Sequence, residues 1–330
     1  MQGKALILTD GKAGHENQSK ALARALGLEA ELLPVKFRSP LAKAASYLLD
    51  RLGIKAGWVF GKLDCGCLGS GGTGCLGSGR ETGDGRREDA GFRVVVGTGS
   101  GAFYAAKVLA ARLGVPCAVV LYPRGYRIGG FGCVMAPAFD RPAKARNVVE
   151  IPANLVASDE AFYAAGVAAF RERYSGKADN LVGVIVGGPN KCSTMTADWI
   201  RARLDETFAS NRGAQMCVTT SRRTPPDVEA VVDSYPWAYK LIYSRDRFNP
   251  IPAFVKLAKR LYVTAESTGM LSEACTCGSA EVFALDNLNP GPHKFRRFVE
   301  GLAAGGYVGG KRKVDLTAEF ARARELLGLT

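Results

Sequence analysis

Short apolar runs alternate with helical patterns along almost the whole chain. In the first half, alanine-rich amphipathic stretches separate apolar runs at 5–10, 93–99 and 117–122. In the second half the alternation repeats, with apolar runs at 181–188, 215–221, 239–244, 261–265 and 280–285. Continuous apolar strands alternating with helices are typical of parallel sheets covered on both faces. The pattern predicts an α/β fold with two Rossmann-like, doubly wound parallel-sheet domains facing a cleft.

The two series of strands are separated by a stretch with a different pattern. Residues 152–180 hold a proline, one helical pattern and no strand-like run. We therefore predict a first domain over 1–151, a connector over 152–180 and a second domain over 181–314. The helical pattern at 315–330 is expected to pack back toward the first domain. Because ligands bind at the carboxyl ends of parallel strands, the loops after the strands are the places to search for a site.

One segment breaks the alternation. Residues 61–91 are rich in glycine and repeat CLGSG at 67–71 and 75–79, with few apolar side chains to offset the entropy of ordering. The composition predicts a mobile surface insertion in the first domain. Cys65, Cys67 and Cys75 offer soft ligands, but no histidine completes a tetrahedral set. No metal site is predicted.

Composition places the chain among globular proteins. It has 330 residues, of which 47% are apolar and 23% are charged. No run approaches the roughly 18 apolar residues of a membrane span, and the first apolar run is too short for a signal peptide. A cytoplasmic location is therefore expected. The nine cysteines are scattered and odd in number, which favours small buried side chains over disulfides.

The net charge of +13 favours anionic partners. Basic residues gather between residues 34 and 62, interleaved with leucines and aromatic residues. Two interpretations are open: a helix that faces the core and turns a basic side to water, or a segment that lies on a membrane surface. The second would make the protein peripheral on the inner face of the plasma membrane, with Lys36, Arg38, Lys43 and Trp58 at the surface. Nucleic acid is not an expected partner, because no reading module is recognisable.

The loop after the first strand, TDGKAGHENQ at 9–18, carries Asp10, Gly11, Gly14 and His15. Histidine titrates near neutral pH, so a histidine on a loop at the carboxyl end of a sheet suits a general base. The alternative is a helix-capping or core histidine. Both interpretations remain open for His15.

The stretch VVVGTGSGA, which contains Gly97 and Gly99, resembles a dinucleotide fingerprint. No acidic residue follows the next strand to hold a ribose. Tight strand-to-helix packing on the acceptor side of the cleft is therefore the favoured interpretation.

Two strand ends in the second domain suit a phosphorylated ligand. The glycine pair Gly187 and Gly188 lets backbone approach a ligand closely. The next strand ends in Ser221, Arg222, Arg223 and Thr224. Adjacent arginines among hydroxyl groups, followed by a helix start, are suited to binding a pyrophosphate.

A third strand end reads LYVTAESTGMLSEACTCG, residues 261–278. Ser267 or Thr268 is predicted to cap the following helix, whose free N–H groups attract an anion. Glu273 lies further along, where its carboxylate could accept hydrogen bonds from ribose hydroxyls. An ordinary acid on the helix surface is the alternative. The pattern predicts a nucleoside-diphosphate site.

Four motifs together, DGKAGHENQ, VGGPNK, TTSRRTPP and FNPIPAFVKLAKRLYVTAESTGMLSEAC, resemble the family of the plant mitochondrial-fission protein and its bacterial relatives. The resemblance covers nearly the whole chain except 61–91. It implies a GT-B-like glycosyltransferase whose second domain binds a nucleotide-sugar donor. It also implies that Ser267 and Thr268 meet the diphosphate, Glu273 the ribose, and Arg222 and Arg223 the phosphate charge, with His15 as base or acceptor contact.

The first functional hypothesis is a metal-independent glycosyltransferase without a cofactor. It would move a sugar from a nucleotide-sugar donor to a lipid-linked or envelope glycan acceptor. One alternative is a non-catalytic, membrane-associated adaptor of the fission-protein type. Another is a nucleotide-sugar epimerase with the same two-domain fold.

Overall fold

The computed structural model describes residues 3–61, 91–176 and 179–329, and it divides into two compact units. The first unit consists of Met1–Ile151 with Leu316–Thr330, and the second of Pro152–Asp315. The insertion predicted at 61–91, with its three cysteines, lies outside the described residues apart from its two end glycines.

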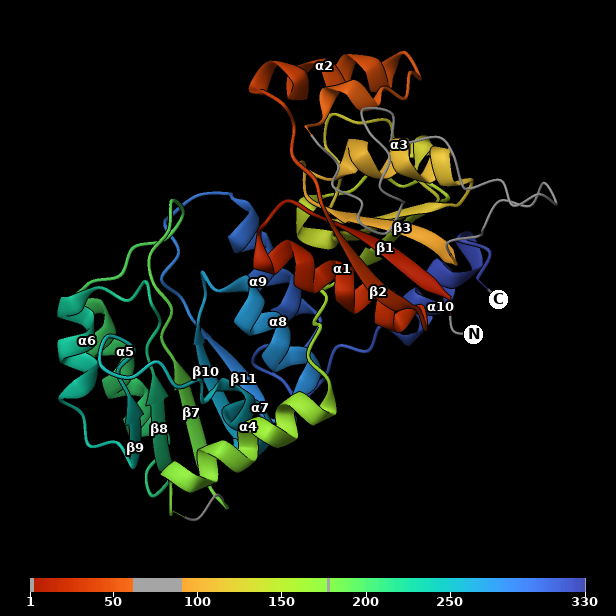
Figure 1. The fold of residues 1–330 in the computed structure, drawn as a ribbon. Coiled ribbons are helices and arrows are strands. Elements are labelled where there is room, and N and C mark those ends of the chain that lie inside the picture. Colours follow the sequence, from red (N-terminus) through yellow and green to blue (C-terminus); the bar gives the residue numbers. More distant parts are fainter. Residues whose placement is uncertain (1–2, 62–90, 177–178, 330) are drawn as a thin grey trace. The chain divides into compact units, whose positions relative to one another are not determined.

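The first unit contains a six-stranded sheet in the order β2-β1-β3-β4-β5-β6, and all of its pairings are parallel (Figure 1). Its strands are β1 (Lys4–Thr9), β2 (Glu29–Pro34), β3 (Phe92–Thr98), β4 (Cys117–Val120), β5 (Cys133–Pro137) and β6 (Val148–Ile151). Its helices are α1 (Ala13–Ala25), α2 (Pro40–Arg51), α3 (Phe103–Leu113) and α10 (Thr317–Leu326), with short 3₁₀ turns η1 (Gly57–Val59), η3 (Ile128–Gly130) and η4 (Ala138–Asp140).

The second unit contains a five-stranded parallel sheet in the order β11-β10-β7-β8-β9. Its strands are β7 (Leu181–Ile185), β8 (Gln215–Thr219), β9 (Tyr239–Leu241), β10 (Arg260–Thr264) and β11 (Glu281–Leu285). Its helices are α4 (Glu160–Arg173), α5 (Ala197–Ser210), α6 (Pro226–Asp233), α7 (Ile251–Leu257), α8 (Thr268–Cys277) and α9 (Lys294–Ala304). The prediction of two parallel-sheet α/β units is confirmed.

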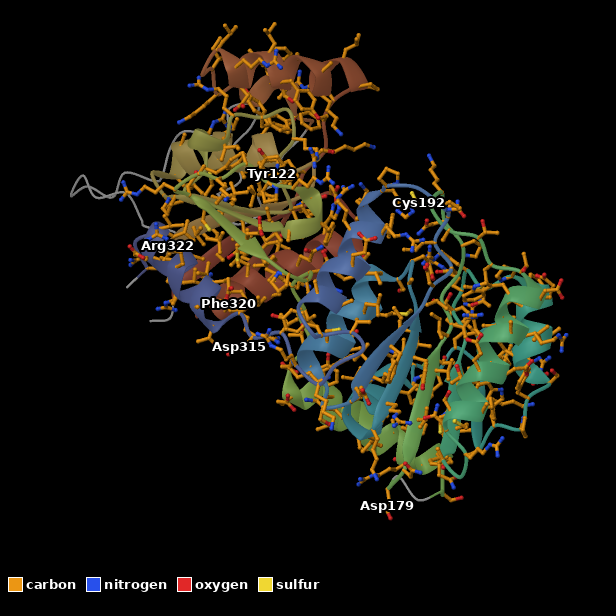
Figure 2. All side chains as sticks on the ribbon, turned by 180° about the vertical axis from the view of Figure 1, so that it is seen from behind. Tyr122, Asp179, Cys192, Asp315, Phe320 and Arg322 are labelled. Atoms are coloured by element: carbon orange, nitrogen blue, oxygen red, sulfur yellow. The ribbon has the colours of Figure 1, made fainter. Side chains whose placement is uncertain are left out.

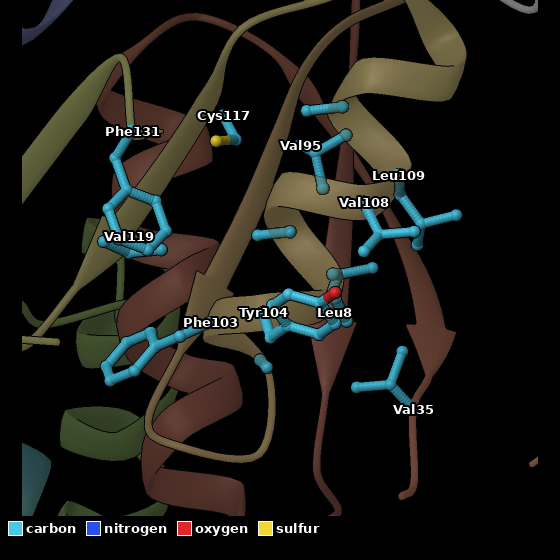
Figure 3. Close-up of a cluster of buried hydrophobic side chains, with 14 of the residues drawn as sticks. Leu8, Val35, Val95, Phe103, Tyr104, Val108, Leu109, Cys117, Val119 and Phe131 are labelled. Carbon is cyan, nitrogen blue, oxygen red and sulfur yellow. The ribbon is translucent and has the colours of Figure 1, made fainter. Parts of the chain in front are cut away.

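The apolar runs of the first half form the core of the first unit. Val95 of β3 is fully buried, and Leu8, Tyr104 and Val119 pack in the same cluster (Figure 3). Both faces of the central strands are covered, so apolar residues occupy successive positions instead of alternate ones. The β3 sequence FRVVVGT shows this, because only its second residue is exposed.

Two segments outside the main series of strands also belong to these units. The segment before β7 belongs to the second unit because α4 packs on α7, with the rings of Phe170 and Phe254 5.7 Å apart. After Asp315 the chain returns to the first unit as α10, which carries Phe320 and Arg322 (Figure 2). There Arg324 Nη1 donates a hydrogen bond of 2.7 Å to the Leu26 carbonyl at the end of α1.

Strand order also locates the switch point of each sheet, where successive strands are added on opposite sides of the first strand. In the first sheet, β2 lies on one side of β1 and β3 lies on the other. In the second sheet, β8 and β10 flank β7 in the same way. Open α/β sheets bind ligands outside the carboxyl ends of the strands at such switch points. The loops after β1 and β3, and after β7 and β10, are therefore the candidate positions.

Candidate functional site

His15 and Asp10 form a hydrogen-bonded pair at the switch point of the first sheet. His15 lies in the first turn of α1, and its Nδ1 is 3.0 Å from Asp10 Oδ2 and 3.1 Å from Oδ1. The backbone N–H of Lys12 also donates to Asp10 Oδ1, at 3.3 Å. A carboxylate beside Nδ1 assigns the proton to that nitrogen and leaves the lone pair on Nε2. The pair therefore presents an imidazole nitrogen that can accept a proton.

The loop after β3 packs directly against this pair. A Cβ atom on Gly99, whose φ is +81°, would lie 2.3 Å from His15 Cε1, and a Cβ on Gly101 would lie 2.8 Å from Asp10 Cβ. Only glycine leaves room there for both side chains, and only glycine adopts the φ of residue 99 without strain. Gly97 packs instead against Ala102, where a Cβ would lie 3.2 Å from the alanine methyl carbon. The two remaining glycines predicted in this region, Gly11 and Gly14, would each place a Cβ in open space.

Two further side chains in this region are held by partners. Lys43 of α2 donates from Nζ to Ser100 Oγ at 2.9 Å, which places its ammonium at the loop after β3. Glu16 accepts from Lys20 Nζ at 2.7 Å, and this hydrogen bond lowers the pKa of the Glu16 carboxyl below its usual range. Glu16 is therefore held ionised beside the pair. The pairing of Lys43 with Ser100 was not indicated by the sequence.

A buried glutamate organises the switch point of the second sheet. Glu266, which follows β10 and is 2% exposed, accepts at Oε1 from the Gly188 N–H at 2.9 Å and from Thr264 Oγ1 at 3.1 Å. Thr264 Oγ1 in turn accepts from the Gly187 N–H at 2.8 Å. A Cβ on Gly187 would lie 1.9 Å from Glu266 Oε1, and one on Gly188 would lie 2.2 Å from the Arg223 carbonyl oxygen. The close approach that this glycine pair permits is to neighbouring loops, and both N–H groups are used there.

The turn after β8 is tied to the same loop. Thr224 Oγ1 accepts from the Ser221 N–H at 2.8 Å and donates to the Gly187 carbonyl at 2.6 Å. Arg222 and Arg223 at the tip of the turn are exposed. Within the described part of the chain, neither guanidinium has a hydrogen-bond or ion-pair partner. The turn is therefore rigid at its base and carries two available cations at its tip.

The first turn of α8 has backbone N–H groups that no side chain of the described residues caps. Ser267 is the residue before the helix, but its side chain makes no capping hydrogen bond, and the following Thr268 begins the helix. The N–H groups of Gly269 and Met270 in the first turn have no acceptor among residues that the structure describes. Unsatisfied N–H groups at a helix start carry partial positive charge. The predicted cap is absent, and the helix start is free to receive an anion.

Glu273 points toward α4. Its Oε1 accepts a hydrogen bond of 2.8 Å from Tyr163 Oη, and the side chain is half-buried. Burial raises the pKa of the Glu273 carboxyl above its usual range, and the hydrogen bond from Tyr163 lowers it in part. Its assignment to a ribose stays a prediction, because the described contact is with a tyrosine of the same unit.

Replacing Glu273 with glutamine should raise the free energy of unfolding near neutral pH by up to about 1 kcal/mol. Because the folded-state pKa is raised, the folded state binds this proton more tightly. That contribution is complete below the ordinary value of 4.5 and is lost as the pH rises through the raised pKa. Urea unfolding at a series of pH values should therefore show a shallower loss of stability in Glu273→Gln. Tyr163→Phe should show a steeper loss, and an unchanged slope in both would contradict the assignment.

Two buried polar atoms near the second switch point have no hydrogen-bond partner among the residues that the structure describes. They are Glu266 Oε2 and Asn287 Nδ2, whose residues are 2% and 5% exposed. Asn287 Oδ1 is 3.3 Å from the Glu266 N–H that donates to it. Buried polar atoms without partners are rare in folded proteins. Sequence reasoning missed both residues. For Glu266, the available signal was an acid directly after an apolar strand, inside the motif TAES.

In the described ranges, no group of three or more His, Cys, Asp or Glu side chains is arranged to hold a metal ion. In the same ranges, no helix is both long enough and apolar enough to cross a membrane. A metal-independent reaction stays a prediction.

Two parallel-sheet α/β units, each with polar loops at its switch point, define a two-domain protein of the Rossmann-like α/β class. The family model described as Mitochondrial fission ELM1 matches residues 13–319, and the chain belongs to that family. A comparison with curated protein sequences gave no match.

Several solved structures are similar to this chain over most of its length. UDP-GlcNAc 2-epimerase from Neisseria meningitidis bound to UDP-GlcNAc is 10% identical, with a TM-score of 0.49 over 99% of this chain and 94% of that one. A UDP-glucosyltransferase from Polygonum tinctorium is 11% identical, with a TM-score of 0.48 over 100% and 93%. MurG from Acinetobacter baumannii is 12% identical, with a TM-score of 0.44 over 98% and 93%.

Proposed function

We propose that this chain is a glycosyltransferase that uses a nucleotide-sugar donor. The observation that carries the proposal is the His15–Asp10 pair, with Nδ1 held on a carboxylate at 3.0 Å at the switch point of the first sheet. In glycosyl transfer, an acceptor hydroxyl oxygen forms a bond to the anomeric carbon while the bond from that carbon to the diphosphate oxygen breaks. The acceptor proton passes to His15 Nε2, and the electron pair leaves with the diphosphate.

The second unit supplies what a departing diphosphate needs. Arg222 and Arg223 are exposed cations without described partners, and the first turn of α8 offers free N–H groups. Guanidinium groups and helix-terminal N–H groups both stabilise phosphate charge without a metal. We assign the donor diphosphate to the carboxyl-end edge of this sheet, together with Ser267 and Thr268.

The buried acceptor at Glu266 favours a ligand with hydroxyl groups. Its Oε2 is buried and unpartnered, whereas its Oε1 is already bonded to Gly188 and Thr264. A carboxylate there accepts hydrogen bonds from sugar or ribose hydroxyls. The acceptor is proposed to be a lipid-linked or envelope glycan, on the inner face of the plasma membrane.

Calorimetric titration with UDP, GDP, CDP, ADP and their sugars tests the donor site. One diphosphate should bind, and Arg222→Ala/Arg223→Ala should weaken its affinity at least tenfold, since a charged hydrogen bond is worth about 1.5–3 kcal/mol. The matched control is Arg171→Ala/Arg212→Ala. It removes two exposed arginines that precede the amino ends of β7 and β8 in the same unit.

Three results would contradict the proposal in different ways. Equal affinity in the double variant and its control would remove Arg222 and Arg223 from the site. Failure of the unmodified protein to bind any of the nucleotides would overturn the transferase and favour a non-catalytic adaptor. Conversion of a bound donor to its epimer without an acceptor would favour a nucleotide-sugar epimerase.

A further inference from the structure

Three leucines of helix α2 and its C-cap face outward, whereas two polar residues are buried on the inner side, where Leu49 also packs against the core. Ser46 and Asp50 are buried, and Ser46 Oγ lies 2.8 Å from Tyr126 Oη. Leu41, Leu48 and Leu52 are 81%, 61% and 64% exposed. Spacings of seven and eleven residues bring side chains back to within about 20° of one line along a helix. The three leucines therefore form one exposed stripe, opposite to the side that packs on the unit. In Figure 1, α2 lies on the outer side of α3.

The exposed apolar surface continues beyond the helix. Ile54 and Trp58, in the turn that follows, are 47% and 58% exposed. Among the described residues, seven large apolar side chains are exposed, and five of them lie between Leu41 and Trp58. Single exposed apolar side chains are common, but a contiguous group marks an interaction surface. These five residues are called the α2 surface below.

The exposed charges of the segment that carries the α2 surface, residues 34–61, have one sign. Lys36, Arg38, Arg51 and Lys55 are exposed in it. The single acid between residues 34 and 61 is Asp50, and its carboxylate is buried 2.6 Å from the Lys107 ammonium. The solvent-facing side of this segment is therefore apolar and cationic, without an exposed acid.

Exposed apolar side chains together with exposed cations favour one kind of binding partner. A second copy docked through the same face would place like charges against each other, which is unfavourable. Apolar side chains flanked by lysine and arginine match the boundary between headgroups and acyl chains of an anionic bilayer. We propose that the α2 surface lies in the plane of an anionic lipid membrane, with Leu41, Leu48, Leu52 and Trp58 inserted at the level of the acyl boundary. This surface does not depend on the transfer chemistry, and its failure would leave that chemistry intact.

Vesicle binding tests the proposal with the full chain. The protein should co-sediment with vesicles of phosphatidylcholine and phosphatidylglycerol, and weakly with phosphatidylcholine alone. Leu41→Ser/Leu48→Ser/Leu52→Ser should reduce the partition coefficient on the order of 30-fold or more, because each leucine loses its burial in the membrane. Lys36→Ala/Lys55→Ala should reduce it about fivefold per residue and remove much of its salt dependence. Phe162→Ser removes an exposed aromatic residue of the second unit and should leave binding unchanged.

Insertion of Trp58 into the membrane can be measured by quenching of its fluorescence. Brominated lipids should quench tryptophan emission in the unmodified protein, and Trp58→Phe should abolish that quenching. Circular dichroism of each variant shows whether it is folded, and exposed substitutions of this kind are expected to fold. Equal vesicle binding by the leucine variant and the unmodified protein would overturn the proposal. A concentration-dependent dimer that the leucine substitutions abolish would also overturn it, in favour of a second copy.

Discussion

Replacing His15 with asparagine should lower donor turnover by about 10²–10⁴-fold, the usual contribution of a positioned general base. Asparagine retains a polar side chain of similar reach but cannot take up a proton. The diphosphate is assigned to the second unit, so the dissociation constant of the nucleotide should not change. Release of free nucleoside diphosphate measures turnover, and calorimetry measures donor binding.

The variant Asp10→Asn distinguishes a catalytic role of His15 as a base from a purely structural role. The carboxylate accepts the Nδ1 hydrogen bond at 3.0 Å and so leaves the lone pair on Nε2. An amide in its place can donate to Nδ1 and favours the opposite tautomer. Turnover should therefore fall in Asp10→Asn, although the unit remains folded.

The chain offers a matched control in its other histidine, His293. It caps α9, with Nδ1 accepting from the Arg296 N–H at 3.3 Å and no carboxylate beside it. His293→Asn should preserve turnover. If His15→Asn retained full turnover while nucleotide still bound, His15 would not be the base, and the epimerase or another base would have to be considered. If His15→Asn weakened nucleotide binding, the pair would belong to the binding site instead.

The central strands could be predicted because burial on both faces leaves a continuous apolar run. The runs at 93–99, 181–188 and 261–265 correspond to β3, β7 and β10 within a few residues. The edge strand β2 was missed because only one of its six residues, Leu33, is buried, and its glutamates break the run. The short strands β5 and β6 were missed as well, with five and four residues each. The β5 sequence CVMAP ends in a proline and the β6 sequence VVEI contains a glutamate, so neither forms a continuous apolar run of clear strand length.

The site loops could be found, but not their internal partners. Strand ends followed by glycine, histidine or arginine pointed to the loops that flank both switch points. The hydrogen bond from the Gly188 N–H to Glu266 joins residues 78 positions apart, and Lys43 meets Ser100 across 57 positions. Such pairings depend on sheet order, which periodicity does not specify.

The orientation of α2 was open for the same reason. Its sequence allowed a core-facing helix or a membrane-surface helix. Periodicity shows that Leu41, Leu48 and Leu52 share a stripe, but the side that faces the core is set by partners elsewhere. Tyr126 accepts or donates the hydrogen bond of Ser46, and Lys107 pairs with Asp50. These two buried polar partners turn the leucines outward.

Replacing Asp50 with asparagine should destabilise the first unit by about 3–5 kcal/mol, the usual cost of removing one partner of a buried ion pair. Asp50 Oδ1 lies 2.6 Å from Lys107 Nζ, and both side chains are 5% exposed. Asp50 Oδ2 also accepts from the Arg127 N–H at 2.6 Å. The variant leaves a buried ammonium that keeps its hydrogen bond to the Arg127 carbonyl but has lost its carboxylate partner. Urea unfolding of the first unit measures the loss.

The pH dependence of that loss identifies its cause. Burial lowers the pKa of Lys107, and the hydrogen bond that its ammonium donates to Asp50 raises it in part. Without Asp50 the folded-state pKa should fall further, so the unfolded state binds the proton more tightly. When the folded-state pKa of a lysine is lowered, the free energy of unfolding is highest above the unfolded-state pKa, where the lysine is neutral in both states. It decreases as the pH falls and the buried lysine has to take up its proton. The defect of Asp50→Asn should therefore shrink as the pH rises from neutrality toward about 10.

Two further variants make the comparison specific. Asp50→Asn/Lys107→Met should recover most of the stability, because it replaces an unpaired charge with an apolar side chain of similar length. Glu160→Gln breaks an ion pair with Lys256 of 2.7 Å whose glutamate is 85% exposed, and it should cost less than about 1 kcal/mol. If Asp50→Asn cost no more than Glu160→Gln, the pair would not hold α2 in place. The orientation of α2 would then be held by its other inward contacts, such as the hydrogen bond between Ser46 and Tyr126.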